Sequence, residues 1–348
     1  MKIAVLVSGG VDSSVALRLL KDAGHDVTAF YLKIWLEDEL SFLGECPWED
    51  DLKYVRAVCK QAGVPLEIVP FQKEYWDRVV SYTVGEVKAG RTPNPDMLCN
   101  ARIKFGAFYD HIGNQYDKVA TGHYAQVDEK VGKTFLKCSP DPIKDQTYFL
   151  SQLSQEQVSR ALFPIGGFEK DEVRELAEKY DLPNAKRKDS QGICFLGKIP
   201  FDKFLEFHLG KRGGKLIEYE TGTVLGEHDG FWYYTVGQRR GIKLPGGPWY
   251  VVKKDTQKNE VFISHGDHHE EAARNTFEVG RVNWITGKPD KKELMVKIRH
   301  GAKFYPATIE CHENKVEVTL SEKDRGVAEG QFAVFYDGEY CLGGGVIG

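Results

Sequence analysis

The chain has 348 residues, of which 41% are hydrophobic and 12% aromatic, so we expect two or three packed domains rather than a disordered chain. No apolar run approaches the roughly 18–20 residues of a membrane-spanning helix. No basic leader precedes the first apolar run, so we expect a cytoplasmic protein or the mature form of an organellar one. The seven cysteines include no CxxC pair, which disfavours a disulfide scaffold and a four-cysteine zinc site. The net charge of −4 argues mildly against unspecific binding of nucleic acid, although residues 186–215 are basic.

The first half of the chain alternates short apolar runs with amphipathic segments. A parallel sheet is predicted from the continuous apolar character of the runs, which lie at 3–7, 27–32, 66–70 and 118–122. Helices are predicted directly after the first of these runs and at 51–63, 71–89 and 169–180. Strands separated by helices indicate an α/β domain.

The composition of the sequence changes after about residue 210. Gly, Thr, Val and Tyr dominate, and short β runs are expected at 222–238, 293–300, 305–322 and 331–347. The tetrapeptides HENK and YDGE stand where hairpin turns should lie. This half therefore predicts one or two small antiparallel sheets or barrels, with a seam near Asn275.

A glycine-rich turn, SGGVDSS, follows the first predicted strand and opens the first helix. Backbone N–H groups at a helix N-terminus suit an anion, and glycines allow phosphate oxygens to approach the backbone. Asp12 cannot hold phosphate directly, but it could bind a bridging Mg²⁺ or cap the helix. The turn is neither a GxxxxGK[ST] loop nor a GxGxxG dinucleotide fingerprint, so it predicts phosphate binding of another kind.

This turn resembles the PP-loop of the ATP pyrophosphatases, which split ATP between its α- and β-phosphates. Further motifs narrow the resemblance to the tRNA-specific 2-thiouridylases: RTPNPDMLCNARIKFG (91–106), ATGHYA (120–125), KDQTYFLSQL (144–153), RKDSQGICFLG (187–197) and YTVGQRRGI (234–242). The resemblance extends over nearly the whole chain. It implies a PP-loop α/β domain with a parallel sheet at 1–205, a small β-rich middle domain at 206–274 and a C-terminal β-barrel that contacts tRNA at 275–348.

The chemistry that the resemblance implies needs two thiols. ATP adenylates the C2 oxygen of the wobble uridine in the tRNAs for Glu, Gln and Lys, and sulfur then replaces that oxygen, giving 2-thiouridine, AMP and pyrophosphate. Cys194 is expected to carry the persulfide, Cys99 to be the partner nucleophile and Asp96 to act as acid and base. Both cysteines must react as thiolates, and nearby cations, Arg102, Lys104, Arg187 and Lys188, are expected to lower their pKa.

The same resemblance implies which residues bind ATP and tRNA. For ATP with Mg²⁺ they are Leu6, Val7, Ser8, Gly9, Gly10, Val11, Asp12, Ser13, Leu32 and Gly122, with Asp12 as the one candidate metal ligand. For tRNA they are His123, Lys144, Asp145, Gln146, Arg299, His300 and Gln331, together with Asn94, Pro95 and Asp96 around a flipped target base. Leu32 and His300 depart from the family, which often has Met at the first position and an aromatic residue at the second.

Two other functions remain open on the sequence. An amide-forming PP-loop synthetase would need an ammonia source and no paired cysteines. A nucleotide-responsive RNA-binding protein without catalytic activity would bind tRNA but release no pyrophosphate. For the thiouridylase we expect a monomer that receives sulfur from a relay protein or a cysteine desulfurase.

Overall fold

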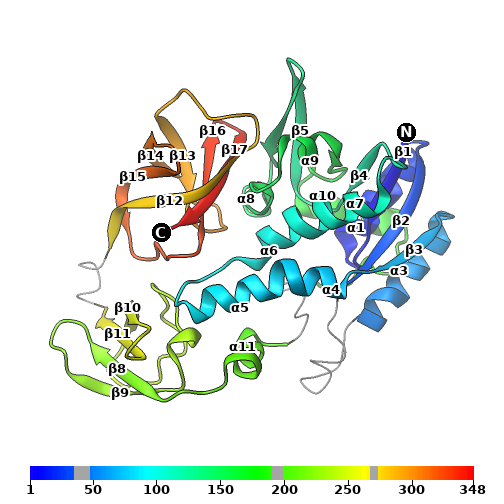
Figure 1. Cartoon of the computed structure of the whole chain (residues 1–348). Helices are drawn as coiled ribbons and strands as arrows, with labels where there is room; N and C mark the ends of the chain where they lie inside the picture. Colours follow the sequence, from blue (N-terminus) through cyan, green and yellow to red (C-terminus); the bar gives the residue numbers. More distant parts are fainter. Residues whose placement is uncertain (35–47, 190–198, 267–272) are drawn as a thin grey trace.

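The computed structural model describes residues 1–34, 48–189, 199–266 and 273–348. Cys194 therefore lies outside the described residues, as does Cys46. The described chain contains one parallel sheet flanked by helices, one four-stranded sheet and one larger antiparallel sheet (Figure 1). No helix among the described residues is both long and apolar enough to cross a membrane.

The parallel sheet forms from the runs predicted in the first half of the chain. Its order is β3-β2-β1-β4-β7, and all its pairings are parallel. The strands are β1 (Lys2–Leu6), β2 (Asp26–Lys33), β3 (Leu66–Pro70), β4 (Lys118–Ala120) and β7 (Ala161–Leu162). Because the strand order reverses between β1 and β4, their carboxyl ends form the crevice where α/β sheets bind ligands.

Helices cover both faces of this sheet, which explains why β1 is apolar at every inner position. On one face Ile3 and Val5 pack with α1 (Val11–Asp22), α3 (Trp48–Ala62) and α10 (Lys170–Lys179). On the other face Ala4 and Leu6 pack with a helical run formed by α4 (Gln72–Tyr75), η2 (Trp76–Val80) and α5 (Ser81–Lys88), and with a second run formed by α6 (Pro95–Leu98), η3 (Cys99–Ala107) and α7 (Phe108–Ile112). The predicted helices are confirmed, although 71–89 contains a π-helical turn.

Shorter helices complete the described helical segments: α8 (Thr147–Leu150), α9 (Gln155–Arg160) and α11 (Phe201–Leu209). The four-stranded sheet has the order β10-β11-β8-β9 and is built from β8 (Gly214–Glu218), β9 (Val224–His228), β10 (Trp249–Asp255) and β11 (Glu260–His265). The β run predicted at 222–238 is only partly correct. After β9, Gly230 adopts a φ of 149°, and the chain turns into a short 3-10 helix, η4 (Phe231–Tyr233), whose Phe231 packs on the sheet.

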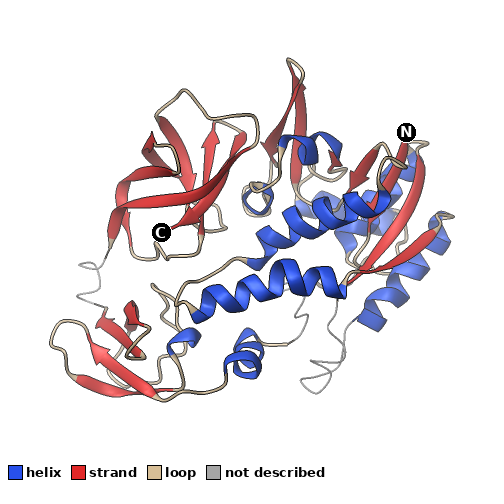
Figure 2. Cartoon of the chain, in the orientation of Figure 1, coloured by secondary structure: helices blue, strands red, loops and turns tan. Residues whose placement is uncertain are grey.

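The C-terminal part is a closed antiparallel barrel, which Figure 2 draws as red strands joined by tan loops. Its order is β12-β15-β14-β13-β16-β17, and β12 also pairs with β17. The strands are β12 (Arg274–Trp284), β13 (Glu293–Lys297), β14 (Tyr305–Cys311), β15 (Lys315–Asp324), β16 (Phe332–Asp337) and β17 (Tyr340–Ile347). The hairpin turns predicted at HENK and YDGE are confirmed, since they join β14 to β15 and β16 to β17.

A hairpin from the first half of the chain extends the barrel sheet. It consists of β5 (Ala125–Lys130) and β6 (Lys133–Cys138), and β6 pairs with β17 through Lys137 opposite Tyr340 and Leu136 opposite Cys341. The sequence pattern did not predict this pairing. This pairing joins the hairpin that follows β4 to the barrel. The turn after β6 therefore lies against the parallel-sheet domain and the barrel.

Candidate active site

The PP-loop lies at the carboxyl end of β1, in the crevice between β1 and β4. Gly10 is the N-cap residue of α1, and no side chain caps the helix, so its first N–H groups point at the crevice without a side-chain acceptor. The loop is braced from within, because the Ser13 hydroxyl donates to the Gly10 carbonyl oxygen at 3.1 Å and accepts from the Ser8 N–H at 3.2 Å. This is the arrangement that binds phosphate at a helix N-terminus.

Two glycines are required by the geometry of the loop. Gly9 has a φ of +79°, and a Cβ there would lie 2.7 Å from the carbonyl oxygen of Asp51. Gly122 follows β4, and a Cβ there would lie 2.5 Å from the backbone nitrogen of Ser13. Leu32, near the end of β2, lies at the same edge of the sheet. The expected ATP-binding residues are thus gathered from three strand ends.

A cluster of ion pairs connects the loop to distant segments. Lys170, the first residue of α10, donates from Nζ to both carboxylate oxygens of Asp12, at 2.7 and 3.0 Å, and pairs with Asp189 at 2.9 Å. Asp189 also binds Lys144 at 2.9 Å and the guanidinium of Arg174. Burial raises the pKa of Asp189, but the hydrogen bonds from Lys170 and Lys144 outweigh it and lower the pKa to about 2. Asp189 is therefore ionised at neutral pH and holds three cations near the loop.

The turn that carries Lys144 is also tied to the barrel. The next residue, Asp145, is 3% exposed and pairs at 3.2 Å with Lys297 of β13, whose side chain is 1% exposed. The Asp145 carboxylate accepts hydrogen bonds from the Thr147 hydroxyl at 2.8 and 3.0 Å. Gln146 is partly exposed, and its side-chain oxygen accepts the N–H of Tyr124 at 3.0 Å. Of the three residues expected to contact tRNA here, Asp145 is thus part of the buried interior.

The expected nucleophile Cys99 lies on a helix. It is the first residue of η3, 1% exposed, among the side chains of the core that also contains Met97 and Leu98. Asp96 precedes it by three residues and is partly exposed, a spacing that brings two helical side chains to the same face. Asn94, the N-cap residue of α6, is partly exposed, whereas Pro95 is buried.

Three of the four cations expected to lower the pKa of the thiols have other partners; Lys104 donates to the side-chain oxygen of Asn100 at 3.0 Å. Arg102 donates to the carbonyl oxygen of Arg78 at 2.8 Å and lies 5.3 Å from the centroid of the Tyr82 ring. Arg187 donates to the Gly9 carbonyl oxygen at 3.0 Å and forms an ion pair with Asp51. Arg187 is therefore part of the PP-loop surroundings, a placement the sequence did not predict.

His123 is buried rather than presented on the surface. Its Nδ1 lies 2.7 Å from the Thr121 hydroxyl, and its ring packs edge-on against Phe163. Burial lowers the pKa of His123 well below its usual value, so the imidazole is neutral at pH 7. A neutral, 9% exposed side chain offers no charge to an RNA backbone.

Arg299 and His300 follow β13 and reach different neighbours. His300 stacks on Phe149 and bonds through Nε2 to the carbonyl oxygen of Asp145 at 3.2 Å. Arg299 binds both oxygens of Asp324 at 2.7 and 2.8 Å. Arg299 and Gln331 line a cavity of about 680 Å³, together with Thr235, Val236, Gly237, Gln238, Tyr250, Lys303, Lys323, Asp324, Arg325, Gly326 and Ala328. This cavity lies between the four-stranded sheet region and the barrel, and four of its lining residues are Lys or Arg.

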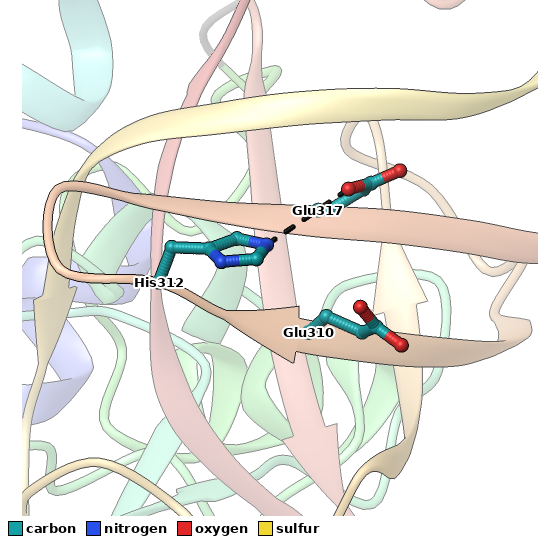
Figure 3. A group of neighbouring side chains, drawn as sticks. All are labelled: Glu310, His312 and Glu317. Carbon is teal, nitrogen blue, oxygen red and sulfur yellow. Dashed lines mark ion pairs between the residues drawn. The ribbon is translucent and has the colours of Figure 1, made fainter.

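A further group of donor side chains lies on the β14–β15 hairpin (Figure 3). Glu310, His312 and Glu317 place their ligand atoms within 4.8 Å of one another, and His312 pairs with Glu317 at 3.9 Å. All three residues are exposed, so water competes for each of them. They belong to the barrel and not to the PP-loop crevice.

The ion-pair cluster around Asp189 is the part of the site that sequence reasoning missed. Its signal was present in the helix predicted at 169–180, because Lys170 and Arg174 are four residues apart and thus share one face. That helix was interpreted only by its apolar positions. Lys297 carried no comparable signal, since a lysine in a strand is ordinarily solvent-exposed.

Comparison with known proteins covers all three parts of the chain. Residues 1–198 match the tRNA methyl transferase HUP domain, 202–265 the tRNA methyl transferase PRC-barrel domain and 274–347 the Aminomethyltransferase beta-barrel domain.

Three relatives match this chain over its full length. The tRNA-specific 2-thiouridylase MnmA of Parabacteroides distasonis is 48% identical, and 100% of this chain and 99% of that protein are covered. The protein of the same name from Porphyromonas gingivalis is 45% identical with the same coverage, and MnmA 2 of Bacteroides fragilis is 46% identical with 100% of both chains covered. On this full-length similarity, the chain belongs to the family of tRNA-specific 2-thiouridylases.

Proposed function

We infer that the chain is a tRNA-uridine 2-sulfurtransferase, which replaces the C2 oxygen of the wobble uridine in the tRNAs for Glu, Gln and Lys by sulfur. The observation that carries this proposal is the full-length identity of 45–48% to proteins named tRNA-specific 2-thiouridylase. The location of the loop supports it, because the crevice between β1 and β4 is where this fold binds a nucleotide.

ATP is the co-substrate in this proposal. Its phosphates bind at the N-terminus of α1, along the segment Leu6–Ser13, and its base lies between Leu32 and Gly122. The uncapped helix and the positive φ of Gly9 fit a bound phosphate chain. Asp12 is the residue that would hold Mg²⁺, which neutralises charge on the phosphates.

The sulfur transfer requires the two cysteines to act in sequence. The C2 oxygen of uridine attacks the α-phosphorus of ATP, and pyrophosphate leaves. The outer sulfur of the Cys194 persulfide then bonds to C2, and the Cys99 thiolate attacks the inner sulfur and breaks the S–S bond. AMP leaves with the C2 oxygen, a Cys99–Cys194 disulfide remains, and a cellular thiol reductant restores both thiols. Asp96, on the same helical face as Cys99, moves the proton that accompanies these steps.

The tRNA is held by several parts of the chain in this proposal. Asn94, Pro95 and Asp96 surround the flipped base, while the RNA backbone contacts Lys144, Gln146, Arg299, His300 and Gln331. His123 and Asp145 have buried side chains, so in this proposal they shape the binding surface and do not touch RNA. The chain acts in the cytoplasm as a monomer and receives sulfur from a relay protein or a cysteine desulfurase.

The decisive experiment supplies the purified chain with unmodified tRNA, ATP, Mg²⁺ and a persulfide donor. Mass spectrometry of the digested nucleosides should reveal 2-thiouridine. Cys99→Ser and Cys194→Ser should each abolish it, because each thiol performs a separate step.

Cys311→Ser is the matched control, since Cys311 lies in the barrel, on β14, and burial raises the pKa of its thiol. It should thiolate at the normal rate. Normal thiolation by either of the first two variants contradicts the mechanism. ATP–pyrophosphate exchange that depends on a small carboxylic acid and not on tRNA contradicts the substrate.

A further inference from the structure

The PP-loop contains no cation of its own. Between Ser8 and Ser14 the sequence has no Lys or Arg and one acid, Asp12. Backbone N–H groups supply partial charges only, whereas the pyrophosphate that leaves ATP carries several full negative charges. A side chain from elsewhere in the chain must therefore supply positive charge if the protein contributes any at this point.

Two cations of the described chain contact the loop, and they differ in how they are held. Arg187 binds the carbonyl oxygen of Gly9, pairs with Asp51 and stacks 4.9 Å from the centroid of the Tyr54 ring. Its guanidinium is thus held on the α3 side of the loop, by Asp51 and Tyr54 of that helix. Lys170 instead places its ammonium on Asp12, the second residue of α1, where the N–H groups of the helix end are aimed.

The position of Lys170 is fixed without Asp12. Its Nζ lies 2.9 Å from Asp189, its backbone N–H donates to the Asp141 carboxylate at 3.2 Å, and its side chain is 12% exposed. Asp189 is itself held by Lys144 and Arg174. Lys170 can therefore exchange an oxygen of Asp12 for an oxygen of a ligand and still keep its other partner.

We propose that Lys170 binds the pyrophosphate half of ATP and stabilises the charge that develops there as pyrophosphate leaves. This rests on the proposed function, because it assigns a residue to the same nucleotide site. Asp12 and Asp189 hold the ammonium beside the helix N-terminus before the nucleotide binds. A preorganised cation of this kind stabilises the leaving group at little reorganisation cost.

The test measures binding of inorganic pyrophosphate and of AMP by titration calorimetry, in EDTA so that no metal contributes. Lys170→Gln should weaken pyrophosphate binding by about 10- to 100-fold, the range for one charge-assisted hydrogen bond, and leave AMP binding unchanged. Lys170→Arg should recover part of the loss. The readout is the ratio of the two dissociation constants, so a folded Lys170→Gln variant in which this ratio is unchanged contradicts the assignment.

Lys179→Gln is the matched control, because Lys179 is an exposed lysine in the last turn of α10, the helix that Lys170 begins. It should keep its affinity for pyrophosphate. The double variant with Asp12→Asn and Lys170→Gln distinguishes two roles of Lys170: direct contact with pyrophosphate, and neutralisation of the Asp12 carboxylate. If the double variant regains normal pyrophosphate affinity, Lys170 serves only as the counterion of Asp12 and the proposal is overturned.

Neither ligand requires tRNA or the cysteines, so this test is independent of sulfur transfer. A chain that makes no 2-thiouridine but shows the expected split between pyrophosphate and AMP contradicts the proposed function and upholds Lys170. A chain that makes 2-thiouridine, but in which Lys170→Gln weakens pyrophosphate and AMP binding equally, upholds the proposed function and contradicts the role of Lys170.

Discussion

Two ion-pair clusters begin at adjacent residues of one turn, and they differ in burial. Lys144 reaches Asp189 beside the PP-loop, where the two side chains are 38% and 26% exposed. Asp145 reaches Lys297 in the barrel, where they are 3% and 1% exposed. A buried pair cannot lose one partner without leaving an uncompensated charge, whereas a partly exposed pair can exchange partners at small cost. The comparison indicates that the barrel cluster fixes the turn, whereas the cluster beside the PP-loop can exchange partners at lower cost.

The largest effect on stability should come from Lys297→Met. It leaves the Asp145 carboxylate buried without its cation, so the free energy of unfolding should fall by about 3–5 kcal/mol. Urea denaturation followed by circular dichroism measures this. Adding Asp145→Asn should recover most of the loss, and a double variant as unstable as the single one would show that the charge is not the cause.

Compared with Lys297→Met, Asp189→Asn should destabilise the chain less and impair nucleotide binding more. It removes the charge that holds Lys144, Lys170 and Arg174, but because the site is partly exposed the loss should be on the order of 1 kcal/mol. Affinity for ATP should fall about tenfold, because the ammonium of Lys170 loses its second anchor.

Asp324→Asn provides the comparison in the barrel, since hydrogen bonds from Arg299 and Tyr305 outweigh burial and lower the pKa of Asp324 to about 2 as well. It should leave ATP affinity unchanged. If Asp189→Asn and Asp324→Asn lowered the affinity for ATP equally, the distinction between the loop cluster and the barrel would be wrong.

Acid should weaken the loop cluster over a defined range. The pKa of Asp189 is about 2 in the folded chain and 3.8 in its ordinary state, so the folded state binds fewer protons between these values. Its stabilising contribution is therefore complete above about pH 5 and is lost as the pH falls through 3.8 towards 2. Unfolding free energies measured from pH 5 to pH 2 should fall less steeply for Asp189→Asn than for the unsubstituted chain, and identical slopes would contradict the assignment.

The smallest effect should come from Lys144→Gln. The exposed pair with Asp189 contributes less than about 1 kcal/mol to stability, so unfolding should barely change. If Lys144 contacts a phosphate of tRNA, the logarithmic salt dependence of tRNA binding should decrease by about one unit. Filter binding at several salt concentrations checks this, and an unchanged slope removes Lys144 from the RNA contacts.

Local patterns predicted the parallel sheet, its helices and the barrel hairpins, because each depends on residues close in sequence. Asp189 and Lys297 could not be found in this way, since each acquires its partners from segments more than ten residues away. Burial of His123 and Cys99 was also missed, because the neighbouring sequence is polar while the tertiary packing covers them. Cys194 lies outside the described residues, so its proximity to Cys99 stays a prediction.

The pairing of β6 with β17 has a consequence for synthesis on the ribosome. Roughly 200 residues separate the two strands, so the hairpin of β5 and β6 emerges long before its neighbour exists. Until then β6 presents an unpaired edge, which is a site where a nascent chain aggregates. A chain whose synthesis stops before residue 340 would thus carry a first domain with an open strand edge at β6, which gains its β17 neighbour only with the last strand.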